Sequence, residues 1–312
     1  MEISLTMFDN LWIEKYRPGT LDDIVLTTQN RAVFEKFAQQ QEIPNLLFVG
    51  NAGIGKTSLA KIICKSVLQC QYLYINASDE NGIDTIRTKV TNFARTKSFD
   101  GSIKCVILDE TDGLSLDAQR ALRNTMEEHS SITRFILTAN YNHRIIPPLQ
   151  SRCQSFDLTP TVEGCVSRVV QILKLEQVSI QSDDHARLEQ FVKACYPDLR
   201  KCINEIQKNT IDGEIRFENL IKVKDAFVEN VYKIVRQGLT LKARKKVIEN
   251  ETVFNGDYPE LMRGLFNHIH DTTSVPDDKK AEHLVIVAEH LYRSAFVADQ
   301  EINFFSCLLS LK

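Results

Sequence analysis

Short apolar runs alternate with amphipathic stretches in the first half of the chain. The runs are rich in β-branched and aromatic residues and each ends at a turn signal, which is typical of buried parallel strands. They cover residues 45–50, 71–78, 103–110 and 133–140. The stretches between them carry apolar residues at intervals of three to four, which predicts helices. These cover residues 56–68, 82–97 and 116–130. The alternation predicts a doubly wound α/β sheet, whose ligand site lies at the carboxyl ends of the strands.

From about residue 159 the strand-like runs stop, and helical periodicity continues to Lys312. We therefore expect three domains, an α/β domain over residues 1–158 and helical domains over residues 159–228 and 229–312. The chain has no apolar run of 18 residues, and no basic segment followed by an apolar one comes after Met1. We predict neither a membrane span nor a secretion signal, and a cytoplasmic location.

Composition narrows the class of protein. The 312 residues are 43% hydrophobic and 25% charged, as in an ordinary soluble protein of two or three domains. The net charge of −3 argues against a globally basic nucleic-acid binder, so DNA contacts would come from a local patch or from several copies together. The eight cysteines are scattered without C-x-x-C spacing. We interpret most of them as small buried apolar residues, expect no structural zinc, and expect free thiols in a reducing compartment.

The stretch "GNAGIGKT" at residues 50–57 predicts a phosphate-binding loop. It matches G-x-x-x-x-G-K-[ST] and stands between a predicted strand and a predicted helix. Its glycines let backbone amides turn toward phosphate oxygens, Lys56 can reach the β and γ phosphates, and the Thr57 hydroxyl can bind Mg²⁺. A glycine turn that merely precedes a lysine is the disfavoured alternative. The predicted nucleotide contacts are Asn51, Ala52, Gly53, Ile54, Gly55, Lys56, Thr57 and Ser58.

Polar residues at the ends of two later strands extend this site. Asp109 follows an apolar run and can hold the Mg²⁺ shell, while Glu110 can polarise the attacking water as a general base. Asn140 ends the next strand, where it can orient the water or contact the γ phosphate. Carboxylates and amides at such positions also serve as helix caps and turn formers, and for Asp112 both interpretations stay open. We predict ATP and Mg²⁺ as cofactors.

Seven segments occur in the order found in one protein family. They are "EKYRP" (14–18), "GNAGIGKT", "NASDENGID" (76–84), "VILDETD" (106–112), "LTAN" (137–140), "PPLQSRC" (147–153) and "YPDLRKCINEIQ" (196–207). In these segments the chain resembles AAA+ clamp loader ATPase subunits, the replication factor C small subunits. Residues 91–110, the form "PDLRK" (197–201) and the compact length resemble the clamp loader subunits of tailed phages most closely. The resemblance covers the first two predicted domains well, and the last by length and helical pattern.

The resemblance implies an architecture and further site residues. It implies an AAA+ module over residues 1–158, a helical lid over 159–228 and a helical collar that joins protomers over 229–312. It places Tyr16 and Arg17 beside the adenine, although locally they also fit an amphipathic surface pair. It makes Arg200 a sensor of the γ phosphate, for which a surface charge is the alternative. It makes Arg152 an arginine finger that reaches the site of a neighbouring subunit.

Partners also follow from the resemblance. It implies a pentamer of copies of this chain with a non-ATPase subunit, acting on a sliding clamp and on primer-template DNA, in the host cytoplasm if a phage encodes it. Arg87 and Lys89 are candidate DNA contacts, with a solvated helix face as the alternative. On the predicted helix over residues 116–130, two roles stay open: lining a central channel of the assembly, or coupling one nucleotide site to the next. The residues concerned are Gln119, Arg120 and Arg123. Another AAA+ DNA machine, such as a branch-migration helicase or an origin loader, is the alternative function. A nucleotide-dependent scaffold is disfavoured, because Glu110 and Arg152 are both present.

Overall fold

The computed structural model describes residues 11–98, 102–179, 184–217, 222–251, 254, 256–273 and 275–311. The chain forms two compact units, residues 1–215 and 216–312. The first unit contains the predicted α/β domain together with most of the predicted lid. The boundary predicted at residue 228 falls inside helix α11 (Lys222–Arg236), whereas the contacts place the division at residues 215 and 216.

A five-stranded parallel sheet forms the centre of the first unit, in the order β2-β3-β4-β1-β5. The strands are β1 (Leu46–Val49), β2 (Tyr72–Asn76), β3 (Lys104–Asp109), β4 (Thr133–Ala139) and β5 (Gln154–Asp157). The first four confirm the predicted strands. The fifth was not predicted, because its sequence QSFD is polar apart from Phe156.

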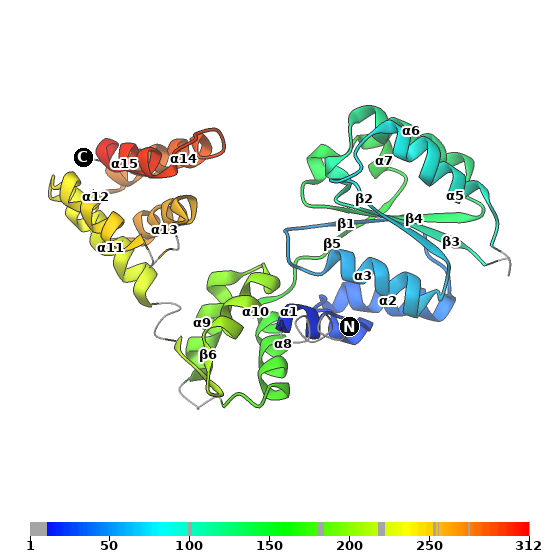
Figure 1. Cartoon of the computed structure of the whole chain (residues 1–312), viewed down its shortest axis with the longest axis horizontal. Helices are drawn as coiled ribbons and strands as arrows, with labels where there is room; N and C mark the ends of the chain where they lie inside the picture. The colour runs from blue at the N-terminus through cyan, green and yellow to red at the C-terminus, as the bar shows by residue number, and fades with distance from the viewer. Residues whose placement is uncertain are drawn as a thin grey trace, which may run out of the picture. The chain divides into compact units, whose positions relative to one another are not determined.

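Helices cover both faces of this sheet (Figure 1). One face carries α2 (Thr28–Gln40) and α3 (Lys56–Ile62), which continues as the π-helical segment η2 (Ile63–Val67). The other carries α4 (Ile83–Thr85), η3 (Ile86–Val90), α5 (Thr91–Arg95), α6 (Leu116–Glu128) and α7 (Pro147–Gln150). Strand side chains alternate between the faces, so Ile107 packs toward α3 and Leu108 toward α6. The same alternation directs Asp109 to the α3 face.

Short 3₁₀ turns and a small helical layer complete the first unit. The turns are η1 (Leu21–Asp23), η4 (Thr111–Gly113) and η5 (Asn142–Arg144). The helices are α1 (Trp12–Lys15), α8 (Val162–Leu175), α9 (Asp184–Cys195) and α10 (Leu199–Lys208). A hairpin of β6 (Thr210–Ile211) and β7 (Glu214–Ile215) departs from the purely helical pattern expected after residue 159. Its turn uses Asp212 and Gly213, both with positive φ, as a two-residue hairpin loop requires.

The second unit is helical throughout the part that the structure describes. It contains α11, α12 (Thr240–Glu249), α13 (Tyr258–Asp271), α14 (Asp277–Arg293) and α15 (Gln300–Ser310). Residues such as Met262, Val287 and Leu308 form a shared apolar core. Two buried polar pairs lie within it, Tyr232 with His283 at 2.8 Å and His290 with Asn303 at 3.0 Å. Among the described residues of either unit, none of the helices has the length and hydrophobicity that a membrane crossing requires.

Candidate nucleotide-binding site

The predicted phosphate loop joins the end of β1 to the start of α3. Gly50, Gly53 and Gly55 all have positive φ, of 138°, 78° and 97°, a conformation that other residues rarely adopt. A Cβ on Gly53 would lie 1.8 Å from a carboxylate oxygen of Asp198, so the close approach also requires glycine. Because α3 begins at Lys56, its unpaired N–H groups face the loop and favour an anion there.

Lys56 lies in the middle of this loop and is only 8% exposed. Its Nζ donates hydrogen bonds to the carbonyl oxygens of Gly50 and Asn51, both at 2.7 Å, and to Oδ1 of Asn140 at 2.8 Å. Burial lowers the pKa of Lys56 to about 8, although the charge of Asp109 opposes this shift. The structure thus brings Asn140 to the phosphate-binding lysine. Ala52 is exposed on the same loop.

Asp109 lies beside Thr57 at the end of β3. The Thr57 hydroxyl donates to Asp109 at 2.7 Å, and the hydroxyls of Thr138 and Tyr74 donate to the same carboxylate at 2.6 and 2.9 Å. Burial and the hydrogen bond to Asp109 raise the pKa of Tyr74. These oxygen donors fit Mg²⁺, which prefers hard oxygen ligands. Thr138 and Tyr74 were not predicted, although strand alternation places both on the Asp109 face.

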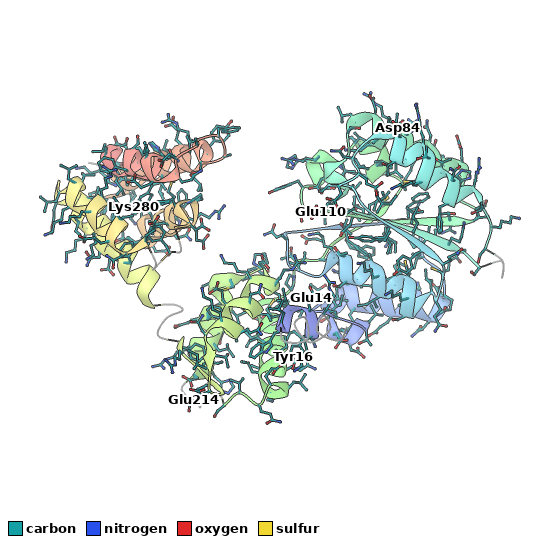
Figure 2. All side chains as sticks on the ribbon, in the orientation of Figure 1. Glu14, Tyr16, Asp84, Glu110, Glu214 and Lys280 are labelled. Carbon is teal, nitrogen blue, oxygen red and sulfur yellow. The ribbon has the colours of Figure 1, made fainter. Side chains whose placement is uncertain are left out.

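Glu110 occupies the first position after β3 in a left-handed conformation, with φ of 53°. Its N–H donates to the Thr138 hydroxyl at 3.0 Å, which fixes the backbone beside Asp109. Its carboxylate accepts a hydrogen bond of 2.5 Å from Ser78. Glu110 lies at the end of the sheet (Figure 2), directly after Asp109, and its side chain bonds to Ser78 and not to Thr57 or Asp109. Ser78 was not predicted as a site residue.

Asp112 supports the site through the backbone. Its Oδ2 accepts hydrogen bonds from the N–H groups of Asn140 at 3.2 Å and Tyr141 at 3.1 Å. These bonds hold the turn that carries Asn140. Of the two interpretations left open by the sequence, the structure gives Asp112 a turn-forming role that acts at the site.

A pocket adjoins the phosphate loop. Its lining includes Gly53, Ile54, Gly55 and Ser58 of the loop region, together with Tyr16, Arg17 and Arg200. The remaining lining was not predicted, because no local motif marks it. It includes Ile24, Val25, Arg168 and Ile203. The apolar side chains provide a slot suited to a base, and Arg17, Arg168 and Arg200 line the same pocket.

Hydrogen bonds hold the Tyr16 segment against α8. The Tyr16 hydroxyl donates to Glu176 at 2.6 Å, and the Tyr16 carbonyl oxygen accepts from Arg168 at 3.1 Å. Burial and the bond to Glu176 raise the pKa of Tyr16. Arg200 lies in the first turn of α10, which Asp198 caps by accepting from the Lys201 N–H at 2.9 Å. Three separate parts of the chain therefore meet at this pocket.

Arg152 lies at the opposite end of the parallel strands, beside the start of β1. It follows α7 and precedes β5, and its carbonyl oxygen accepts a hydrogen bond of 3.4 Å from Asn45, the residue before β1. The phosphate loop begins after the other end of β1, and four strand residues span about 13 Å. The Arg152 guanidinium donates to the Pro148 carbonyl oxygen at 2.7 Å and pairs with Glu127 of α6. It is therefore separated from the other predicted site residues.

The candidate DNA contacts lie on a different surface. Arg87 and Lys89 are exposed on η3, where Lys89 pairs with Glu80 at 2.6 Å. Arg87 and Arg120 line a shared hollow between η3 and α6. Gln119 is only 1% exposed and bonds to the backbone of Leu114, Arg144 and Ile146, so it does not line a surface channel. Arg120 is exposed and Arg123 is half-buried on the same helix.

The phosphate loop, the acidic end of β3 and the strand order define a P-loop ATPase of the AAA+ class. Residues 46–160 match the family model described as "ATPase family associated with various cellular activities (AAA)". RuvB of Thermotoga maritima, a Holliday junction branch migration motor, superposes with a TM-score of 0.51 at 19% identity, over 71% of this chain and 80% of RuvB. At this identity the likeness shows the fold alone.

Full-length relatives define the family. The replication factor C small subunit of Sulfurisphaera tokodaii is 36% identical over 96% of this chain and 94% of its own length. The replication factor C small subunit of Thermofilum pendens is 36% identical over 98% of this chain and 97% of its own length. The chain belongs to the replication factor C small subunit family. It is an ATPase subunit of a clamp loader.

Proposed function

We propose that this ATPase works in an assembly of several copies with one non-ATPase subunit, a pentamer, in the cytoplasm. With ATP bound, the assembly opens a ring-shaped sliding clamp and grips primer-template DNA, and hydrolysis releases the loaded clamp. One observation carries this proposal. The phosphate loop, Thr57 and Asp109 lie together, whereas Arg152 lies at the other end of β1, beside Asn45. This separation supports a finger that one protomer supplies to the site of the next.

The chain's own residues have separate tasks in hydrolysis. The loop N–H groups and Lys56 hold the phosphates, the apolar slot beside Tyr16 takes the base, and Thr57 with Asp109 would hold Mg²⁺. Bound Mg²⁺ neutralises charge that develops on the phosphate oxygens. Glu110 accepts a proton from the attacking water, and Asn140 orients that water. Arg17 contacts the base or a phosphate, and Arg200 contacts the γ phosphate from the lid.

DNA binding depends on the assembly rather than on one subunit. A net charge of −3 gives a single chain little attraction for phosphates. Several copies in a spiral would repeat Arg87 and Lys89 along the duplex backbone. If the chain is encoded by a phage, as its segments suggest, the assembly acts in the cytoplasm of the host cell.

The proposal is tested by measuring ATP hydrolysis with and without the cognate clamp and primed DNA. We expect clamp and DNA together to stimulate the rate. A rate that neither of them changes would refute clamp loading, while leaving the ATPase assignment intact.

ATP affinity should fall as the pH rises above about 8. The pKa of Lys56 is lowered to about 8 by burial and by Arg200, against the opposing charges of Asp109, Asp112 and Glu110. Phosphate stabilises the ammonium, so ATP binding takes up a proton when the free protein has lost it. Well above pH 8, the affinity for ATP should therefore fall about tenfold for each further pH unit. Calorimetry across this range, in buffers of different ionisation enthalpy, measures both effects.

Lys56→Arg is the matched control for this pH dependence. A guanidinium stays charged throughout the range, so its affinity profile should be flat. If the wild-type protein bound ATP equally well on both sides of pH 8, Lys56 would not be the titrating contact.

Glu127→Gln should raise hydrolysis by the assembly in the absence of clamp and DNA. The Glu127 carboxylate pairs with Arg152, and the Arg152 side chain is 32% exposed. An exposed ion pair contributes about 0.2–1 kcal/mol. Its removal therefore raises the population of unpaired Arg152 side chains by about fivefold at most. Glu128→Gln, next on the same helix, is the control. Equal basal rates in the two variants would show that the pair does not restrain the finger.

A further inference from the structure

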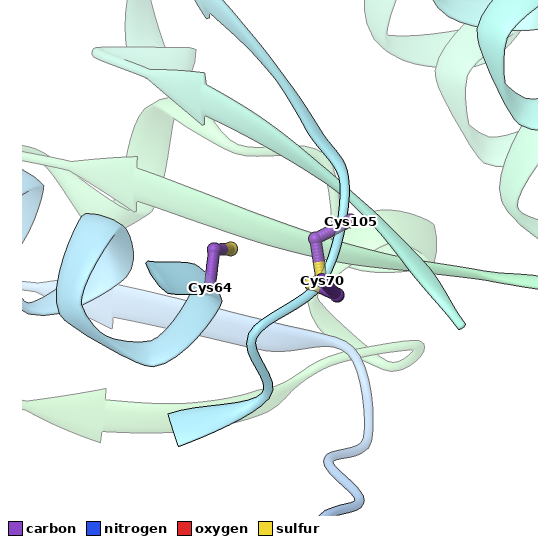
Figure 3. Close-up of side chains that lie close together, drawn as sticks. All are labelled: Cys64, Cys70 and Cys105. Atoms are coloured by element: carbon purple, nitrogen blue, oxygen red, sulfur yellow. The ribbon is translucent and has the colours of Figure 1, made fainter. Parts of the chain in front are cut away.

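Three cysteine sulfurs converge inside the first unit, away from the nucleotide pocket. The Sγ atoms of Cys64, Cys70 and Cys105 all lie within 4.8 Å of one another (Figure 3). Cys64 belongs to η2, Cys70 to the turn before β2, and Cys105 to β3. The sequence does not predict this group by C-x-x-C spacing. Pairing of β2 with β3 brings Cys105 to the other two cysteines. All three thiols are free.

The backbone holds the three positions in place. The N–H of Cys70 donates to the Cys64 carbonyl oxygen at 3.0 Å, across a turn in which Gln69 has a φ of 47°. The N–H of Cys105 donates to the Gln71 carbonyl oxygen, also at 3.0 Å. Because helix, turn and strand are all fixed, the sulfurs converge without a rearrangement of the backbone. Such preorganisation favours a ligand site.

The group offers soft donors only. Cys64 and Cys105 are fully buried and pack with apolar residues such as Ile62 and Ile107, whereas Cys70 is the least buried residue of the three. Among the described residues, no histidine or carboxylate joins the group. Hydrogen bonds among the three thiols lower the pKa of Cys70 and, together with burial, raise the pKa of Cys64 and Cys105. An ion would therefore have to displace the protons of Cys64 and Cys105.

The donor set selects the kind of ion. Metal–sulfur bonds of about 2.3 Å place the three sulfurs of a trigonal site about 4 Å apart, which small side-chain rotations would reach from the observed spacing. Zinc requires a fourth ligand, and its structural sites are four-coordinate. Soft thiolates without a hard ligand suit Cu(I), which three sulfurs satisfy.

We propose that Cys64, Cys70 and Cys105 bind one soft monovalent ion of the Cu(I) class as three thiolates. Binding releases the thiol protons to solvent, and no electron is transferred. The ion would join the helix that begins with Lys56 to the strand that ends with Asp109. It would lie about 12 Å along that helix from Lys56, so it is separate from the nucleotide site.

Anaerobic titration of the reduced full-length protein with Cu(I), against a coloured Cu(I) chelator, tests the site. We expect one ion per chain to be retained, with a thiolate-to-copper absorption band. Cys64→Ala, Cys70→Ala and Cys105→Ala should each weaken retention at least about tenfold, because each removes one of three ligands. Cys307→Ala, a buried cysteine of the second unit, is the matched control.

Substitution of buried cysteines can disturb folding, so two further measurements use the wild-type protein. Bound Cu(I) should slow alkylation of Cys70, the most accessible of the three thiols. A parallel titration with Zn(II) should show weaker retention than Cu(I). Unchanged alkylation, stronger retention of Zn(II), or equal retention in the three variants and the control would overturn the proposal.

Discussion

Glu110→Gln should leave Mg-ATP binding near normal and lower turnover by about two orders of magnitude or more. The Glu110 carboxylate bonds to Ser78, whereas the hydroxyl of Thr57 bonds to Asp109. Removing the charge of Glu110 therefore removes the base for the attacking water and leaves the candidate Mg²⁺ ligands in place. Equilibrium ATP binding and single-turnover hydrolysis, measured on the same assembled protein, separate the two effects.

Lys56→Ala provides the contrasting variant. Lys56 is the cation inside the phosphate loop, so its loss should weaken ATP binding itself. An affinity loss in Glu110→Gln as severe as that in Lys56→Ala would show that the roles assigned to these residues are wrong.

Mixtures of Arg152→Ala and Lys56→Ala protomers should recover part of the activity that each variant lacks alone. An arginine finger contributes about 10³ to 10⁵ in rate, so both variants should be nearly inactive. In a mixed assembly, some interfaces pair an intact phosphate loop from the first variant with an intact finger from the second. Hydrolysis with clamp and primed DNA, measured over a range of mixing ratios, reports these interfaces.

The same mixtures distinguish a finger that acts on a neighbour from one that acts within its own protomer. A finger acting within the protomer would leave every chain inactive through its own substitution, at every ratio. Lack of recovery in mixtures that sedimentation shows to co-assemble would exclude action on the neighbour.

Local patterns predicted most of the fold. The inner strands β1, β3 and β4 are apolar runs, because helices cover both faces of the sheet, and the edge strand β2 also carries mostly apolar and aromatic residues. β5 escaped prediction because its residues are polar apart from Phe156. The β6–β7 hairpin was also missed, although Asp212 and Gly213 form a recognised turn pair.

The candidate site was predictable where its residues are neighbours in sequence. The phosphate loop and the acidic end of β3 are such stretches. Tyr74 and Thr138 reach the site from other strands and Ser78 from the turn after β2, and their roles depend on strand pairing that the sequence does not state. The apolar slot is assembled from three distant segments, so no local spacing marks it. The three cysteines also come from separate elements, so their convergence was not predictable from local spacing.

The placement of Arg152 and the phosphate loop at opposite ends of β1 has a consequence for symmetry. A protomer that donates a finger from one edge and receives one at the other makes a head-to-tail interface, in which the two partners use different surfaces. A twofold dimer cannot satisfy both edges. In the proposed assembly the copies of this chain form an arc beside the non-ATPase subunit, so they alone would complete one site fewer than their own number. The number of active sites therefore reports whether the non-ATPase subunit also supplies a finger.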